Sequence, residues 1–155
     1  RLPISFPAAL KGQTMQGTGC RYVVRTIGRL MEFNARQRTI DFDFDLSVQP
    51  VWIQADRRQM EQVLINAVKN ALESIGNRGT ITFKTSVSPV QLEIIDSGPG
   101  IRPEIADQLF SPFFSTKKNG QGVGLTLVRE ILVNHDFGVS LRTEKEGETV
   151  FRVGF

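Results

Sequence analysis

The chain is poor in the residues that build disulfides, thiol sites and zinc centres. It holds one cysteine, Cys20, and one histidine, His135, among 155 residues. A single cysteine excludes a disulfide within the chain and fits a reducing compartment. A zinc site lacks ligands, and a cysteine–histidine nucleophile pair is left only as a minor alternative. We expect His135 to be structural.

Long apolar runs are missing as well. No run of about 18 apolar residues occurs and no signal-peptide pattern opens the chain, so we expect a cytoplasmic location. The chain begins at Arg1 rather than Met, which favours a part of a longer protein. That parent could still be anchored in the inner membrane.

Charge of one sign is not concentrated anywhere. The net charge is +3 and the pI about 9.4, but the basic residues are dispersed. Arg21, Arg25 and Arg29 come nearest to a basic stripe, and a solvated helix face explains them. Without a strong basic face or clustered aromatics, nucleic acid is not an expected partner.

Residues 59–75 have the apolar period of an amphipathic helix packed on a core. Asn66 and Asn70 are four residues apart, so both amides leave one side of this helix. Asparagine is a mediocre helix former, because its side chain competes for backbone hydrogen bonds. The pair suggests a binding role, for a metal or a phosphate, against the alternative of a solvated polar face.

Periodicity and turn residues predict a single domain over 18–155, preceded by a linker or irregular arm over 1–17. The expected elements are helices over 18–36, 57–75, 103–110 and 123–135, strands over 39–46, 51–54, 80–87, 90–95, 138–145 and 149–153, and a mobile loop over 111–121. Val23, Ile27, Leu30, Met31 and Asn34 are expected on one side of the first helix. The sum is an α+β two-layer sandwich, with helices on one face of a mixed, mostly antiparallel sheet.

Two local features of these elements are specific. Asp56 is placed to N-cap the second helix, and Gly76-Asn77 to end it. Asp41, Asp43 and Asp45 alternate with apolar residues, as on the solvated face of a strand. A calcium loop that began at Asp41 would need a glycine at its sixth position and a glutamate at its twelfth. Those positions hold Leu46 and Trp52, so we do not expect a calcium site.

Asp96 directly follows an apolar strand and is followed by Gly98 and Gly100. An ionised carboxylate accepts hydrogen bonds only, so it suits the exocyclic amine of adenine and disfavours the carbonyl of guanine. Glycine lets another group approach the backbone closely. The alternative is a plain turn, because the segment is rich in turn formers.

A second glycine-rich segment, Gly120-x-Gly122-x-Gly124, opens the last predicted helix. Free N–H groups there favour a phosphate, although the spacing fits neither a dinucleotide fingerprint nor a P-loop. Lys117 precedes it and could meet a terminal phosphate. The amide oxygen of Asn70 or Asn66 could hold Mg²⁺.

These segments together resemble the ATP-binding catalytic domain of bacterial sensor histidine kinases, in particular the nitrogen-regulation type. The motifs that carry the resemblance are Asn66-x3-Asn70-Ala, Asp96-x-Gly-x-Gly100, Phe110-x2-Phe-Phe-Ser-Thr-Lys117 and Gly120-x-Gly-x-Gly124-Leu, the N, G1, F and G2 boxes of that family in their usual order. The resemblance covers residues 18–155 and implies the Bergerat ATP-binding fold.

It also implies a role for each matching residue. Asn70 would hold Mg²⁺ with Asn66 near the phosphates, Asp96 would bind the adenine amine, and Lys117 would reach the γ-phosphate. Phe110, Phe113 and Phe114 would anchor the lid, and Thr149 would help to hold adenine through water. The full set of expected contacts to the nucleotide is Asn66, Asn70, Asp96, Gly98, Gly100, Ile101, Phe110, Thr116, Lys117, Gly120, Gly122, Val123, Gly124, Leu125 and Thr149.

Hydrolysing members of the wider superfamily carry a glutamate where this chain has Asn66, and an amide is a poor general base. The resemblance therefore implies transfer to a histidine on a separate dimerisation domain, with a response regulator receiver domain as the next partner. It implies a homodimeric parent, while the chain by itself is expected to be a monomer. An ATPase, an anti-sigma-type serine kinase and a non-catalytic nucleotide-sensing module are the alternatives.

Overall fold

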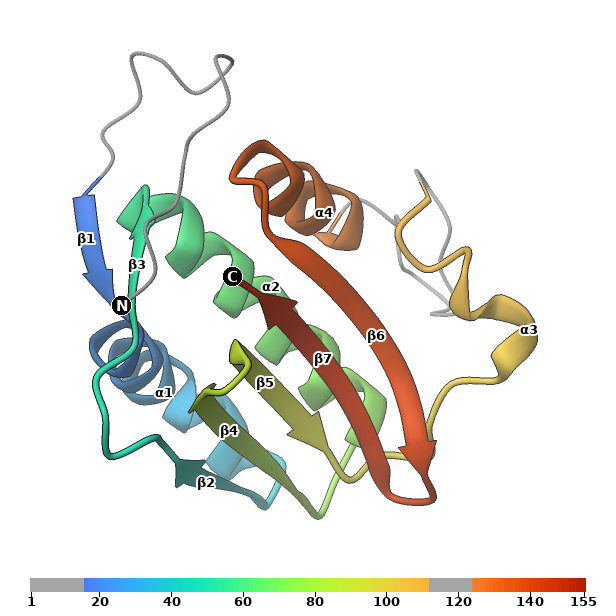
Figure 1. Ribbon diagram of the computed structural model, residues 1–155. Coiled ribbons are helices and arrows are strands. Elements are labelled where there is room, and N and C mark those ends of the chain that lie inside the picture. Colours follow the sequence, from blue (N-terminus) through green and yellow to red (C-terminus); the bar gives the residue numbers. More distant parts are fainter. Residues whose placement is uncertain (1–15, 112–123) are drawn as a thin grey trace.

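The computed structural model describes residues 16–111 and 124–155 (Figure 1). Its elements are β1 (Gln16–Gly19), α1 (Cys20–Gln37), β2 (Ile40–Asp45), β3 (Trp52–Ala55), α2 (Arg57–Ile75), β4 (Gly79–Val87), β5 (Val90–Asp96), α3 (Pro103–Ala106), α4 (Gly124–Asn134), β6 (Gly138–Lys145) and β7 (Glu148–Gly154).

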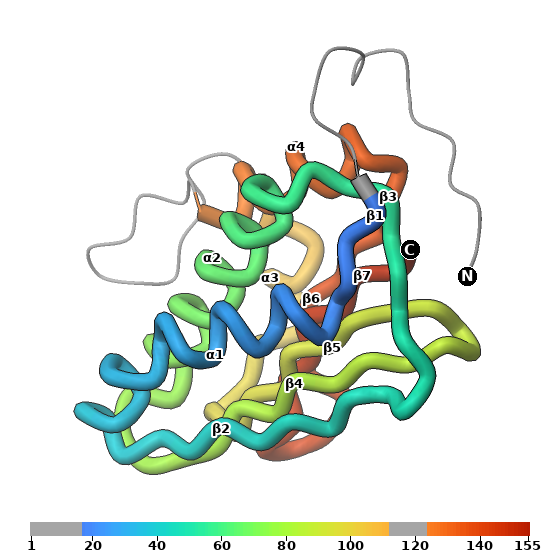
Figure 2. Tube along the Cα trace, turned by 90° about the vertical axis from the view of Figure 1, so that its left-hand side faces the viewer, coloured from blue at the N-terminus to red at the C-terminus, as the bar shows by residue number. Residues whose placement is uncertain are grey.

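A five-stranded sheet in the order β2-β4-β5-β7-β6 forms one layer of the molecule. β2 runs parallel to β4, and every other pair in this sheet is antiparallel. Helices α1, α2 and α4 form the second layer on one face, with α2 packed between the other two (Figures 1 and 2). The predicted α+β two-layer sandwich is confirmed.

Helix α2 lies at the centre of this helical layer, and its ends are set by the residues that the sequence indicates. The Asp56 carboxylate accepts a hydrogen bond from the Gln59 backbone N–H at 3.0 Å, which caps the first turn. Gly76 ends the helix with a φ of +79°. Its core stripe is buried: Met60, Val63, Leu64, Ala67, Val68, Ala71 and Leu72.

The core between helices and sheet centres on Phe83 of β4, which is fully buried. Phe42 meets its ring edge-on at 5.2 Å between centroids, and Phe44 stacks on it at 5.0 Å. A Cβ at Gly28 would lie 2.7 Å from the Phe44 ring. The glycine that weakens helix propensity in α1 is therefore required for α1 to approach β2.

The N-terminal part differs from the prediction. Gln16–Gly19 is a strand that pairs antiparallel with β3, where an irregular arm and the start of a helix were expected. Helix α1 then begins at Cys20, and its buried stripe includes Val23, Ile27 and Met31 but neither Leu30 nor Asn34. Placing those two residues on the core side was wrong, because the sheet contacts α1 through the arc centred on Ile27.

The predicted helix over 103–110 is also shorter than expected. Only Pro103–Ala106 is helical, and the N–H groups of Gln108 and Ser111 then bond three residues back, as in successive turns. None of the four helical residues is buried, so no apolar face extends the helix.

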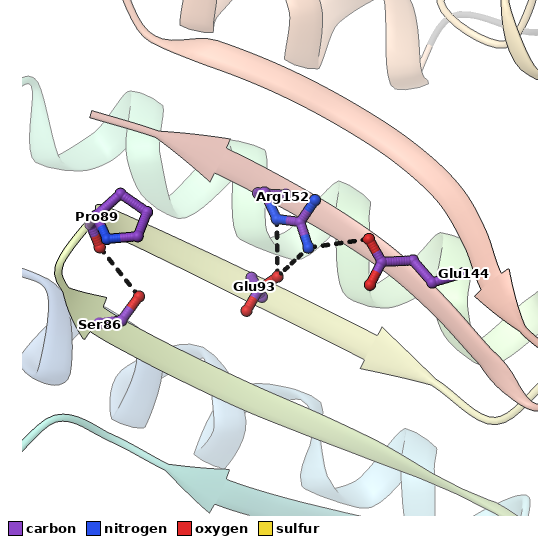
Figure 3. Close-up of polar contacts among 5 residues, drawn as sticks. All are labelled: Ser86, Pro89, Glu93, Glu144 and Arg152. Atoms are coloured by element: carbon purple, nitrogen blue, oxygen red, sulfur yellow. Dashed lines mark hydrogen bonds and ion pairs between the residues drawn. The ribbon is translucent and has the colours of Figure 1, made fainter.

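The open face of the sheet carries paired charges. Arg152 of β7 donates to Glu93 of β5, its cross-strand partner, at 2.8 Å, and to Glu144 of β6 at 3.1 Å (Figure 3). The Glu93 side chain is 8% exposed, so this pairing satisfies a carboxylate that has lost most of its water. At the edge of the same face, Asp41, Asp43 and Asp45 are exposed, as predicted.

Candidate functional site

The polar side of α2 supplies the first group of site residues. Asn66 and Asn70 are both half-buried, and Ser74 continues the same stripe one turn further on. The Nδ2 atom of Asn66 is buried and has no hydrogen-bond partner among the residues that the structure describes. A buried donor without a partner costs about 1–3 kcal/mol, so this amide is suited to meet a ligand.

The start of α4 lies beside that amide. A Cβ added to Gly124 would be 4.0 Å from the Asn66 Oδ1 atom, so the predicted phosphate-binding helix start and the α2 asparagine are neighbours. Phe110 is joined to the same helix, because the Thr126 hydroxyl donates to its carbonyl at 3.4 Å. Phe110 and Leu125 both pack against the core.

Asp96 ends β5 and is 4% exposed. Its Oδ1 atom accepts a hydrogen bond from the Gly98 backbone N–H at 2.9 Å. Burial raises the pKa of the Asp96 carboxyl, and the Gly98 N–H opposes that shift by stabilising the charged form. The group is thus an orientated acceptor whose charge is only partly satisfied by the protein.

The two glycines after Asp96 are required by close packing. A Cβ at Gly98 would lie 2.7 Å from the Ser74 hydroxyl, so only glycine lets this loop rest on α2. Gly100 has a φ of +96°, and a Cβ there would lie 2.9 Å from the Thr143 hydroxyl. The loop is therefore held between α2 on one side and β6 on the other.

Thr149 lies directly opposite Asp96 in the β5–β7 register and is 2% exposed. Its hydroxyl is 3.0 Å from the hydroxyl of Thr143 in β6, which also accepts the Ile101 N–H at 2.7 Å. Thr143 is not among the site residues predicted from the sequence. The hairpin around Gly147 was the available signal, because its register pairs Thr143 with Thr149.

The predicted site residues in the described part of the chain form two groups. Asp96, Gly98, Gly100, Ile101 and Thr149 surround the end of β5, and Asn66, Asn70, Gly124, Leu125 and Phe110 lie along α2 and the start of α4. Ser74 lies beside the Asp96 loop, and it is about 12 Å from Asn66 along the axis of α2. This distance separates the two groups. Phe113, Phe114, Thr116, Lys117, Gly120, Gly122 and Val123 lie outside the described residues.

Residues 55–155 match the family model described as histidine kinase-, DNA gyrase B- and HSP90-like ATPase. The chain belongs to this family. The predicted resemblance is thereby confirmed, and so is ATP as the ligand of the domain. Within residues 16–111 and 124–155, no helix combines the length and the apolar character needed to cross a membrane.

Similar proteins are sensor kinases. The sensory histidine kinase/phosphatase NtrB of Rhodobacter capsulatus is 37% identical over 126 residues, covering 72% of this chain and 35% of NtrB. Sensor histidine kinase ZraS of Salmonella typhi is 32% identical over 143 residues, covering 90% of this chain and 31% of ZraS. The chain thus spans about a third of the length of these relatives, and the likeness to NtrB agrees with the nitrogen-regulation type.

The fold agrees as well. The solved catalytic domain of histidine kinase ThkA superposes with a TM-score of 0.80 at 32% identity, covering 91% of this chain and 94% of that domain. A complex of ThkA with the response regulator protein TrrA matches with a TM-score of 0.75, covering 90% of this chain and 40% of ThkA. The chain is an ATP-binding domain of the sensor histidine kinase type.

Proposed function

We propose that this domain binds Mg-ATP and transfers the γ-phosphoryl group to a histidine on a separate dimerisation domain of the parent protein. The observation that carries this proposal is the polar stripe of α2. It runs from the Asn66 amide, which has no partner among the described residues, to Ser74 beside the Asp96 loop. One end of the stripe offers the amide donor of Asn66, and the other end lies beside the buried carboxylate of Asp96. A nucleotide needs such groups at its phosphate end and its base end.

At the base end, Asp96 accepts the exocyclic amine of adenine, and Gly98 and Gly100 keep the loop close to the ligand. Thr149 stands beside Asp96 and completes the base contacts. Guanine presents a carbonyl where adenine has its amine, and two facing acceptors in a buried site cost about 1–3 kcal/mol. The domain is therefore selective for ATP over GTP.

At the phosphate end, Asn70 would supply an oxygen ligand for Mg²⁺, which when bound would neutralise charge on the phosphate oxygens. The Asn66 amide donates to a phosphate oxygen, and the N–H groups at the start of α4 do the same. Lys117, from the predicted lid, is the counter-charge of the γ-phosphate.

The transfer forms a phosphorus–nitrogen bond on the acceptor imidazole while the bond from phosphorus to the β–γ bridging oxygen breaks, and ADP leaves. Such a transfer depends mainly on positioning and charge neutralisation. Asn66 stands where a hydrolysing relative has a glutamate, and its amide activates water poorly. By analogy with the ThkA complex, the phosphorylated parent, a homodimer, then meets a response regulator.

The test is a Mg²⁺-dependent titration of the domain with ATP and with GTP, repeated on Asp96→Asn. We expect wild type to bind ATP more tightly than GTP, and to lose about tenfold or more of its ATP affinity in Asp96→Asn, because the amide can present a donor to the adenine amine. The control is Asp43→Asn, which removes an exposed charge of β2. Unchanged ATP binding by Asp96→Asn contradicts the role of Asp96.

A second assay distinguishes the alternatives. With a helical-hairpin dimerisation domain added, labelled ATP is expected to mark a histidine of that domain. Steady hydrolysis that Asn66→Ala abolishes supports an ATPase, and a labelled serine supports a serine kinase. ATP binding without any transfer supports a nucleotide-sensing module.

A further inference from the structure

Three hydroxyl- and carboxyl-bearing side chains lie in one row across the sheet. Thr143 of β6 is opposite Thr149 of β7, and Thr149 is opposite Asp96 of β5. Residues directly opposite one another in a sheet share a face, and here that face carries the helices. The row therefore ends at the carboxylate assigned to the base.

The direction of the hydrogen bonds in this row follows from its first donor. The Ile101 backbone N–H can only donate, and it does so to the Thr143 oxygen at 2.7 Å. A hydroxyl that already accepts a hydrogen bond becomes a better donor, because aligned bonds polarise one another. Over the 3.0 Å to Thr149, Thr143 is thus the favoured donor. The hydroxyl proton of Thr149 is then left to donate next to Asp96.

We propose that Thr143 is a positioning residue for base recognition, which makes Thr149 a donor beside the acceptor Asp96. The inference rests on the proposed function, because it assigns the order of donor and acceptor at the base site. Adenine presents its amine as a donor and the adjacent ring nitrogen N1 as an acceptor. Guanine presents the opposite pair at the same two positions, a carbonyl and an N–H.

A second contact explains why the hydroxyl is fixed. The Thr143 hydroxyl and methyl fill the space beside Gly100, at 2.9 and 3.0 Å from where a Cβ would be. Valine has nearly the shape of threonine, so Thr143→Val keeps this packing and removes only the hydroxyl. Thr143→Ser keeps the hydroxyl and removes the methyl group.

The matched control is Thr85→Val. Thr85 of β4 is 6% exposed, and its hydroxyl accepts the Ser47 N–H at 2.8 Å, the same kind of bond that Thr143 makes with Ile101. Ser47 and Thr85 are not among the site residues. Loss of this hydroxyl therefore reports what such a bond contributes to stability alone.

The experiment measures ATP and GTP affinity with Mg²⁺, together with the melting temperature, for wild type and the three variants. Thr143→Val is expected to weaken ATP about tenfold, the equivalent of one hydrogen bond, and to reduce the ATP/GTP preference by a similar factor. Thr143→Ser is expected to stay within about twofold of wild type. Thr85→Val is expected to lower the melting temperature and leave both affinities unchanged.

A nucleotide analogue tests the same step without a variant. The triphosphate of 1-deazaadenosine keeps the amine but lacks the N1 acceptor. We expect it to bind wild type about tenfold more weakly than ATP, and Thr143→Val no more weakly than ATP binds that variant.

Three results overturn the inference: wild-type ATP affinity in Thr143→Val, equal losses of ATP and GTP in that variant, or full affinity of wild type for 1-deaza-ATP. Failure of wild type to bind ATP at all would instead contradict the proposed function. Should Thr143→Val not fold, the analogue on wild type still tests the donor beside Asp96, because full affinity for 1-deaza-ATP overturns the inference.

Discussion

At the scale of single residues, the role proposed for Asp96 acts against the stability of the fold. Its carboxylate is buried, and within residues 16–111 and 124–155 the Gly98 N–H of its own loop is the one donor recorded for it. Burial raises its pKa in the folded protein above the ordinary value of 3.8. The ionised form that the proposed contact with the base requires is therefore the form that folding disfavours.

The pH dependence follows with a definite sign. Between the ordinary pKa and the raised folded value, the folded state binds more protons than the unfolded chain, so this group makes stability fall as the pH rises through that window. Asp96→Asn is expected to be more stable than wild type at neutral pH, since the amide oxygen can still accept from Gly98. At pH values above this window, the free energies of unfolding of wild type and Asp96→Asn are expected to change with pH in the same way.

Urea denaturation of wild type and Asp96→Asn between about pH 4 and pH 8 checks this expectation. Asp43→Asn serves as the exposed control and should follow wild type. Equal stability of wild type and Asp96→Asn at every pH would show that burial of the charge carries no cost. ATP affinity of wild type should move the other way and fall as acid protonates Asp96.

At the scale of elements, α1 is apolar on two sides. Ile27 is 1% exposed on the core side, whereas Leu30 is 59% and Phe33 68% exposed on a flank of the helix that faces solvent. Sequence periodicity grouped Leu30 with Ile27, because residues three apart are neighbours on a helix. Which of two apolar stripes faces the sheet was decided by Phe44, which packs against Gly28.

A matched pair of variants measures this difference. Ile27→Ala is expected to lower the free energy of unfolding by about 2–5 kcal/mol, because it leaves a cavity in the core. Leu30→Ala is expected to change it by no more than about 0.5 kcal/mol, because the side chain is largely in water. Denaturant unfolding of the two variants gives both values, and a similar loss in both would mean that Leu30 is buried.

Other elements show where sequence patterns suffice. Helix α2 was predicted with both ends, because its cap, its apolar period and its terminal glycine are all local signals. Strand β1 was missed, because Gly17 and Gly19 are residue types that strands disfavour, and this segment forms a strand through its pairing with β3. That pairing brings together segments about 36 residues apart, which no local pattern reports.

At the scale of the whole molecule, the only histidine joins two helices. His135 is fully buried, its Nδ1 atom lies 2.8 Å from the Ile131 carbonyl, and its Nε2 atom accepts from the Asp56 N–H at 3.2 Å. Since the Asp56 N–H can only donate, Nδ1 carries the ring proton. This supports the structural role predicted for His135, because both ring nitrogens are used within the fold.

We therefore expect that the 155-residue chain, incubated alone with Mg²⁺ and γ-labelled ATP, carries no phosphohistidine. Its single imidazole has neither exposure nor a free nitrogen with which to attack phosphorus. Acid-labile label on the chain that disappears in His135→Gln would contradict this expectation. Label on an added acceptor domain in the same assay shows that the nucleotide site is active.

The sequence by itself determined the ordered motifs, the capped central helix and the sheet-forming alternation, because each depends on residues close together in the chain. The tertiary structure alone decided that the buried Asn66 amide has no partner within residues 16–111 and 124–155, that Gly98 rests on Ser74 and that Thr143 joins Ile101 to Thr149. These are contacts between distant segments, and they depend on strand register and helix packing, which only the assembled core sets.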